Sequence, residues 1–321
     1  MASTTQQTGQ PGPAPLSTGA VRRGDQVFKG LSTAAGVLIL AILAGVAVFL
    51  FAQALPALTA DAEDLPGGNG LVAYIGPLLY GTVLAALIAL VIATPLAVGI
   101  ALFISHFAPR RLAQGLGYTV DLLAAVPSIV YGIWGLTVLA RWLVPVYAWL
   151  AENAGFIPLF AGPASATGRT IFTAGTVLAV MILPIITAIS RDVFMQTPRL
   201  HEEAALALGA TRWEMIRYAV IPYGRSGVIS AAMLGLGRAL GETMAVAIVL
   251  SGSGTYTLNL ISGSNPSTIA ANIALQFPEA SGLTVNTLIA SGLALFVITF
   301  LVNMAARWIV NRRAEFSGAN G

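Results

Sequence analysis

The feature that most limits what this chain can fold into is a series of long stretches without charged residues. Residues 30–60 contain no charged side chain, and residues 71–108 contain none apart from the ionisable His106. About 20 residues of helix cross the hydrocarbon core of a bilayer, so each stretch can hold a membrane-spanning helix. Hydrophobic residues make up 56% of the chain and charged residues only 9%, which is typical of an integral membrane protein and excludes an ordinary soluble domain.

Six stretches of this kind predict an all-α integral membrane protein with six transmembrane helices. Pro95 inside the second stretch favours a kink, because proline removes a helical hydrogen bond. Residues 142–168 contain too much proline and glycine for a span, so we expect an interfacial loop or a short amphipathic helix with aromatic rings at headgroup level. The predicted spans are residues 30–60, 71–108, 122–140, 170–190, 228–250 and a stretch within 280–306.

The distribution of basic residues predicts which side of the membrane each loop occupies. Of the 16 lysine and arginine residues, only Arg141 and Arg169 fall in loops on one side, and Arg238 lies within a predicted span. All the others lie in the N-terminal flank, in two loops and in the C-terminal tail, which six spans place together on the opposite side. Because basic residues concentrate on the cytoplasmic side, both termini and the loop of residues 191–225 are predicted to be cytoplasmic.

The chain is predicted to divide into four parts. Residues 1–28 are expected to form a disordered cytoplasmic tail, because their small and polar residues bury too little apolar surface to offset chain entropy. Residues 29–70 would hold the first transmembrane helix and an extracytoplasmic loop. Residues 71–310 would form the core with the other five transmembrane helices, and residues 311–321 a second cytoplasmic tail.

The cytoplasmic loop of residues 191–225 carries signals for two short helices at a bend. A proline in the first turn, a glycine after the last turn and a capping box are the kinds of signal that mark helix ends. These signals are Thr197-Pro198 and Gly209 for the first helix, and the capping box of Thr211 and Glu214 followed by Pro222 for the second.

The surface of the first short helix bears on whether this loop meets another protein. Ala204, Ala205 and Leu208 would present small side chains and a nearly flat face, which another protein could approach closely. The alternative interpretation is a helical hairpin that packs on its own bundle.

A cation and a carboxylate follow in a predicted span. Arg238 and Glu242 are four residues apart and are expected on one helical face. Charges inside a membrane are costly and usually face the bundle interior or a wet cavity, so the functional interpretation is a translocation pathway in which the guanidinium fork binds an oxyanion. The alternative is an internal salt bridge that locks helix packing. Gly237 and Gly241 form a G-x-x-x-G motif, which lets helices approach closely.

Several kinds of site are excluded by residues that are absent. The chain has no cysteine, so it has no disulfide, no thiolate metal site and no cysteine nucleophile. The only histidines, His106 and His201, are far apart in the sequence and are interpreted as interface or solvent residues. No G-x-x-x-x-G-K-[ST] motif occurs, so ATP, if it drives this protein, must be bound by another chain. No catalytic residue, metal site, cofactor or nucleic-acid partner is predicted.

At the loop the residues resemble a known family. Glu203-Ala204-Ala205 followed by Gly209 is similar to the EAA motif of ABC-importer permeases of the binding-protein-dependent type, although residues 219–222 read Ala-Val-Ile-Pro where Ile-x-Leu-Pro is usual. The resemblance implies a type I ABC-importer permease fold with cytoplasmic coupling helices. It also implies that Glu203, Ala204, Ala205 and Gly209 dock on an ATP-binding subunit.

Two further stretches resemble the permeases of phosphate importers. Residues 122–135 and 238–246 carry this resemblance, and the Met-Ala that follows Gly-Glu-Thr favours the PstC type of subunit over its PstA-type sister. The resemblance implies a phosphate permease half in the cell membrane that pairs with a PstA-type permease, an ATP-binding subunit dimer and an extracytoplasmic phosphate-binding protein. Arg238 and Glu242 would line the alternating-access pathway, and the permease itself would make no covalent bond.

Two other functions remain open from the sequence. The first is a permease for another oxyanion, such as sulfate or molybdate, since a charged helix does not separate these anions. The second is an ion-coupled secondary transporter that acts alone. The absence of a visible internal repeat, the few acids in the spans and the elaborate cytoplasmic loop argue against this second function.

Overall fold

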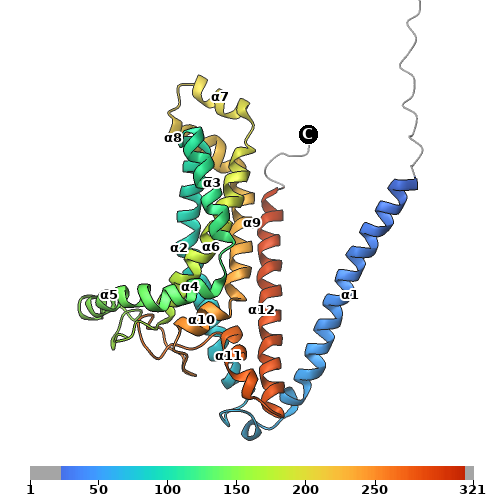
Figure 1. Cartoon of the computed structure of the whole chain (residues 1–321), viewed down its shortest axis with the longest axis vertical. Coiled ribbons are helices and arrows are strands. Elements are labelled where there is room, and N and C mark those ends of the chain that lie inside the picture. The colour runs from blue at the N-terminus through green and yellow to red at the C-terminus, as the bar shows by residue number, and fades with distance from the viewer. Residues whose placement is uncertain (1–22, 315–321) are drawn as a thin grey trace, which may run out of the picture. The chain divides into compact units, whose positions relative to one another are not determined.

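The computed structural model describes residues 23–314, and the regular elements in this range are all helices (Figure 1). The predicted disordered tail of residues 1–28 lies mostly outside the described range. Where it enters that range the prediction of disorder is wrong, because α1 (Arg23–Thr59) already begins at Arg23, with Asp25 in its first turn. At the other end, α12 (Leu283–Ala314) extends into the predicted tail of residues 311–321, whose remainder is not described.

The described chain forms two compact units, which divide between Phe49 and Leu50 within α1. The first unit is one helix whose sequence is apolar on all sides, as expected of a helix surrounded by lipid. The second unit holds the other elements. In chain order they are the 3₁₀ turn η1 (Ala62–Asp64), α2 (Leu71–Leu102), the π-turn η2 (Phe103–Phe107), α3 (Arg110–Ala124), α4 (Ser128–Trp134), the π-turn η3 (Gly135–Leu139), α5 (Ala140–Asn153), α6 (Ile171–Met195), α7 (Arg199–Ala207), α8 (Arg212–Met215), the π-turn η4 (Ile216–Val220), α9 (Ile221–Leu240), α10 (Met244–Val249), α11 (Ile269–Gln276), the 3₁₀ turn η5 (Phe277–Glu279) and α12.

The core of the second unit lies between α2, α6 and α9. Helix α6 packs most extensively on α2 and next on α9, and it buries apolar side chains such as Val177, Ile182 and Ile186. The facing side of α2 is a stripe of buried alanines at helical spacing, which lets the two helices approach closely. These alanines are Ala85, Ala86, Ala89, Ala93, Ala97 and Ala101.

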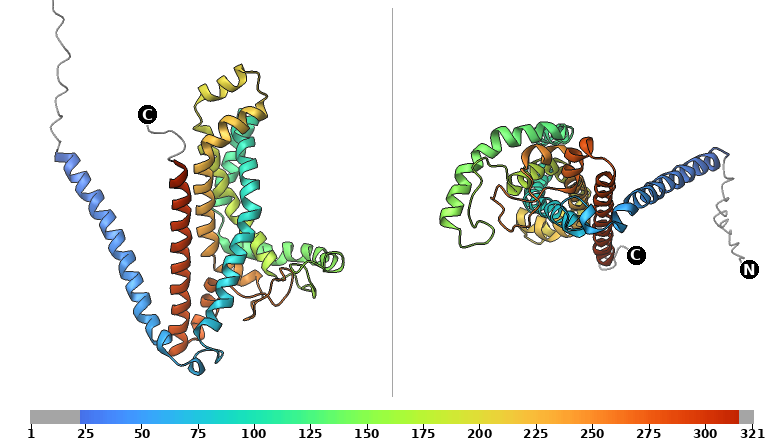
Figure 2. Two further views of the ribbon diagram at one scale, coloured as in Figure 1. Left: turned by 180° about the vertical axis from the view of Figure 1, so that it is seen from behind. Right: turned by 90° about the horizontal axis from the view of Figure 1, so that it is seen from below.

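The predicted third span, residues 122–140, is not one continuous helix. Helix α3 ends at Ala124 and α4 begins at Ser128, with Pro127 between them. Proline disfavours the helical conformation of the residue before it, so the chain bends here. From Ser128 the helix continues to Asn153 and lies across the bundle of α2, α6 and α9 rather than along it (Figures 1 and 2). Its exposed Trp142 and Trp149 and its buried Tyr147 make α5 an amphipathic helix, one of the two forms expected for this stretch.

Six helices of the described residues are long and apolar enough to cross a membrane. By length and composition these six candidate spans, one of which is the helix from Ser128 to Asn153 that lies across the bundle, agree with the predicted all-α fold and its six transmembrane helices. The second span runs without a break through Pro95. The fifth begins and ends earlier than the predicted residues 228–250. The six are Gly24–Thr59, Leu71–Phe107, Ser128–Asn153, Ile171–Met195, Arg212–Leu240 and Leu283–Trp308.

Candidate functional site

Two short helices, α7 and α8, form a hairpin at one end of the bundle (Figure 1), which confirms the predicted bend. Helix α7 starts after Pro198 and ends before Gly209, whose φ of +84° lies in the left-handed region that favours glycine. The backbone N–H of Thr211 donates to Glu214 Oε2 at 2.7 Å, and the N–H of Glu214 donates to Thr211 Oγ1 at 3.3 Å. The predicted capping box that opens α8 is therefore confirmed.

The prediction that Pro222 ends the second helix is wrong. After α8 the chain continues through the π-turn η4 directly into α9, where Pro222 lies in the first turn. A proline in that position costs no hydrogen bond of the helix, because the first N–H groups of a helix have no partner within it. The π-turn shifts the pattern of backbone hydrogen bonds just before the proline. Ile216 and Val220 of this turn are fully buried with Phe194 and anchor the start of α9.

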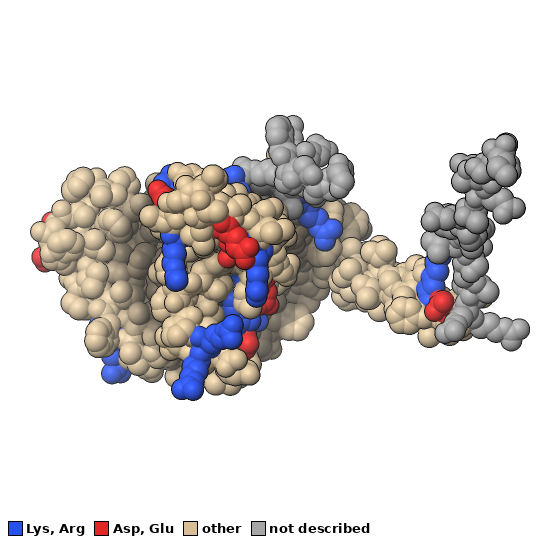
Figure 3. Space-filling view, turned by 90° about the horizontal axis from the view of Figure 1, so that it is seen from above, with Lys and Arg blue, Asp and Glu red and all other residues tan. Residues whose placement is uncertain are grey.

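The surface of α7 is left open by the rest of the chain. None of its residues is buried, and Glu203, Ala204 and Gly209 are exposed. Leu208, just after the helix, exposes 90% of its surface, while Ala205 packs partly against the buried cluster beneath it. Charged side chains of both signs gather on this face of the molecule (Figure 3). The four residues expected at a docking contact therefore lie together around one largely exposed short helix.

Arg238 and Glu242 do not share a helical face, which corrects the expectation from their spacing. Helix α9 ends at Leu240, and α10 begins at Met244, so Glu242 lies in the break between them. The carboxylate of Glu242 accepts a hydrogen bond from the N–H of Ala245 at 3.1 Å and so caps α10. Arg238 is exposed and forms no ion pair with any described side chain, so the alternative of an internal salt bridge with Glu242 gains no support. Tyr131 of α4 lies near enough to Arg238 to interact electrostatically.

Gly132 of α4 and Gly135 of η3, rather than the G-x-x-x-G motif, make the close helix contacts beside this break. A Cβ atom at Gly237 would meet nothing within 4 Å, and one at Gly241 would meet only backbone of its own helix. By contrast, a Cβ at Gly132 would lie 2.9 Å from the Cα of Ala245, and one at Gly135 would collide with Val177. Helix α4 therefore packs directly against α10, while Gly237 faces open space.

Arg169 is a functional candidate that the sequence analysis placed only in a loop. Its Nη2 donates to the carbonyl oxygens of Ile248 at 3.3 Å and Leu250 at 3.4 Å. These carbonyls end α10, where a cation is favoured by the helix dipole. The signal was missed because no local pattern places the loop of Arg169 beside residues 248–250, which lie about 80 residues later in the chain.

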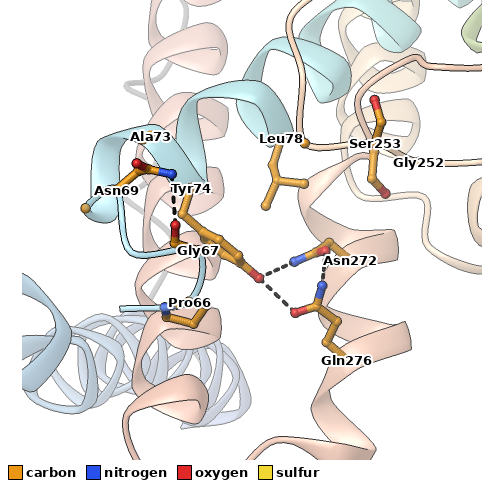
Figure 4. A pocket seen from close by; sticks show the side chains of 13 residues that line it. Pro66, Gly67, Asn69, Ala73, Tyr74, Leu78, Gly252, Ser253, Asn272 and Gln276 are labelled. Carbon is orange, nitrogen blue, oxygen red and sulfur yellow. Dashed lines mark hydrogen bonds between the residues drawn. The ribbon is translucent and has the colours of Figure 1, made fainter. Parts of the chain in front are cut away.

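A pocket of about 290 Å³ lies at the other end of the bundle from the α7–α8 hairpin. Tyr74 of α2 and two residues of α11 close a ring of hydrogen bonds on one wall (Figure 4). The Tyr74 hydroxyl donates to Gln276 Oε1 at 3.0 Å, Gln276 donates to Asn272 Oδ1 at 2.9 Å, and Asn272 donates to the Tyr74 oxygen at 2.9 Å. No charged side chain lines the pocket, so it lacks the cation that an oxyanion site requires.

The arrangement of a hairpin at one end and a broken charged helix in the bundle can be compared with known proteins. Residues 93–315 match the family model described as the binding-protein-dependent transport system inner membrane component, and this match covers the hairpin, the break and α10. The chain belongs to this family.

Relatives of this family are similar over nearly the whole chain. The phosphate transport system permease protein PstC 2 of Mycobacterium bovis is 48% identical over 92% of this chain and 94% of its own length. The PstC protein of Mycobacterium leprae is 46% identical over 95% of this chain and 99% of its own length. The PstC protein of Mesorhizobium japonicum is 42% identical over 92% of this chain and 92% of its own length.

Solved structures of ABC transporters show the same fold. A chain from a bacterial ABC transporter involved in the import of the acidic polysaccharide alginate superimposes with a TM-score of 0.59, at 15% identity, over 91% of this chain and 97% of that chain. A chain of the MetNI methionine ABC transporter superimposes with a TM-score of 0.50, at 18% identity, over 75% of this chain and 95% of that chain. The chain is thus a multi-pass membrane permease with the type I ABC-importer fold.

Proposed function

We propose that this chain is the permease subunit of an ATP-driven phosphate importer, of the PstC type. The observation that carries the proposal is an exposed arginine without an ion-pair partner among the described side chains. Arg238 lies beside a helix break in a membrane chain that is 46–48% identical to phosphate permeases of mycobacteria. A guanidinium without a carboxylate is free to bind an incoming oxyanion through two parallel hydrogen bonds.

Glu242 would work beside Arg238 in the pathway. One carboxylate oxygen accepts a hydrogen bond from the backbone N–H of Ala245, which favours a position of the charge at the break rather than on Arg238. A fixed negative charge near a cationic site weakens anion binding by repulsion, which helps release. We therefore assign Arg238 to binding and Glu242 to release during alternating access.

The partners follow from the two open surfaces. The exposed α7, with Glu203, Ala204, Ala205 and Gly209, would dock on an ATP-binding subunit dimer in the cytoplasm. The distribution of basic residues predicts this side of the membrane for the hairpin and both termini. The unoccupied space at Gly237 would receive the sister permease of PstA type, which completes the pathway. A phosphate-binding protein would deliver the anion at the opposite face.

The experiment is phosphate uptake by cells that have or lack this chain, before and after ATP is depleted while the ion gradients are held. Uptake that requires both the chain and ATP supports the proposal. Uptake that survives the loss of ATP would identify a secondary transporter instead. Sulfate and molybdate uptake measured in the same cells tests the two other oxyanions, and transport of either of them without phosphate would overturn the proposed substrate.

A further inference from the structure

Two neighbouring glutamates of α7 have different surroundings. Glu203 is exposed and forms no ion pair with a described side chain. Glu202 exposes only 24% of its side chain, and its Oε1 lies 3.5 Å from Nε2 of His106. His106 belongs to η2, the π-turn that continues α2. Glu203 is therefore exposed to solvent, whereas the adjacent Glu202 contacts His106 at the end of the bundle.

The other side of the imidazole is also bound. His106 exposes only 9% of its side chain, and its Nδ1 lies 2.7 Å from Ser105 Oγ. Ser105 Oγ in turn donates to the carbonyl oxygen of Ala101 at 2.8 Å. Both ring nitrogens of His106 therefore have a partner, one within η2 and one on α7.

Few other contacts hold α7 in place. No residue of α7 is buried, and Ala205 is the one residue of the helix that packs on the apolar cluster below it. The ring of His201 meets the ring of Tyr223 of α9 edge-on, with centroids 6.5 Å apart. The two histidines of the chain thus both take part in contacts of α7, one with η2 and one with α9. Because α2 packs most extensively on α6, the pair of His106 and Glu202 connects the hairpin to the best-packed part of the bundle.

We propose that His106 and Glu202 are positioning residues that transmit the movement of α7 to α2, while Glu203 contacts the partner subunit. The proposal rests on the proposed function, since it assigns a role in coupling to a contact within the permease. If α7 moved without this pair, it would pivot on its few apolar contacts and the motion would not reach α2. ATP hydrolysis would then continue with less transport.

The first experiment measures phosphate moved per ATP hydrolysed by the whole transporter in proteoliposomes. Glu202→Gln and His106→Gln should each lower this ratio by roughly fivefold or more, at the lower end of couplings between sites, with co-purification of the ATP-binding subunit unchanged. The double variant with His106→Glu and Glu202→His should recover most of the ratio, because it restores the contact between η2 and α7 with the two side chains exchanged. Glu152→Gln, on the exposed face of α5, is the matched control. An unchanged ratio in both single variants would overturn the proposal.

The second experiment does not depend on what is transported. Because the chain has no cysteine, spin labels can be placed on cysteines at Leu208, beside α7, and Tyr118, on α3, both highly exposed. In the full-length chain in lipid, Glu202→Gln should broaden the distance distribution between the labels, whereas Glu203→Gln should leave it narrow. Equal distributions in these two variants would contradict the positioning role. If no variant moved phosphate, the proposed function would fail, and this measurement would still decide on the positioning of α7.

Discussion

The two ends of the helix that runs from η4 through α9 are held in different ways. At its start, the α7–α8 hairpin has no buried residue in α7 and depends on a capping box and on the contact between His106 and Glu202. At its end, α10 is clamped by backbone contact with Gly132 and by the Arg169 guanidinium. The hairpin is therefore exposed and held by few contacts, whereas the region around α10 is held by close packing and hydrogen bonds. Substitutions at the hairpin should therefore change coupling, and those around α10 should change stability or transport.

The largest effect is expected from Glu203→Arg. Reversing a charge at a contact between proteins places like charges together or leaves the partner's charge unpaired, which costs about 2–5 kcal/mol. The amount of ATP-binding subunit that co-purifies with the chain should therefore fall at least about tenfold, while the thermal stability of the chain stays the same because Glu203 is exposed. Glu152→Arg is the control. Undiminished co-purification of the Glu203 variant would refute the docking role.

Arg238→Ala should produce the next largest effect, and it should act on transport alone. Losing hydrogen bonds from a charged donor costs about 1.5–3 kcal/mol, so phosphate uptake should drop roughly ten- to a hundredfold. Assembly should be unaffected, because Arg238 is exposed and has no ion-pair partner among the described side chains. Arg238→Lys keeps the charge but not the guanidinium fork, so its phosphate uptake should lie between that of the unchanged chain and that of the alanine variant. Full uptake by the alanine variant would reduce Arg238 to a packing residue.

Gly132→Ala tests how closely α4 packs against α10. The added methyl group would lie 2.9 Å from the Cα of Ala245, so backbone must shift, at a cost of about 1–3 kcal/mol. Gly99→Ala in α2 is the matched control, because a Cβ there meets nothing within 4 Å and the gain in helix propensity should raise stability by about 0.5–1 kcal/mol. Unfolding free energies in mixed micelles should thus change with opposite signs. The same sign for both would show that α4 and α10 are not tightly packed.

Thr211→Ala should give the smallest effect, confined to the hairpin. Removing the capping hydroxyl costs about 1 kcal/mol, so the first amides of α8 should exchange with solvent about fivefold faster. The melting temperature of the whole chain should hardly change, because this end contributes little to the core. Hydrogen exchange followed by mass spectrometry measures both regions at once. Faster exchange throughout α6 would mean that the hairpin supports the core after all.

The hairpin could be predicted almost residue by residue because its signals are local. Gly209 marks the end of α7 through a backbone angle that favours glycine. The side chains of Thr211 and Glu214 accept hydrogen bonds from each other's backbone N–H within one turn. The error was at Pro222, which was read as an end although it begins α9. A proline can mark either the end of a helix or its first turn. The π-turn before Pro222 decides for the first turn here, and a π-turn has no clear sequence pattern.

The two charges proposed to line the pathway could be found from the sequence, but their arrangement could not. A charge within an apolar stretch is visible in any sequence, so Arg238 and Glu242 were identified. Their spacing suggested one face of one helix, whereas α9 ends at Leu240 and Glu242 caps the next helix. That end depends on α4, which lies more than a hundred residues earlier in the chain and reaches α10 through Gly132.

Membrane spans and their class follow from composition alone, because a backbone in lipid must satisfy its own hydrogen bonds and a long apolar stretch can do so only as a helix. The places where those helices break, and the groups that meet there, follow from contacts between distant segments. Gly132 against Ala245, Arg169 on the last carbonyls of α10 and His106 beside Glu202 each join residues whose proximity no local pattern indicates. Close packing and paired charges depend on distances in space, and these arise only when the bundle has formed.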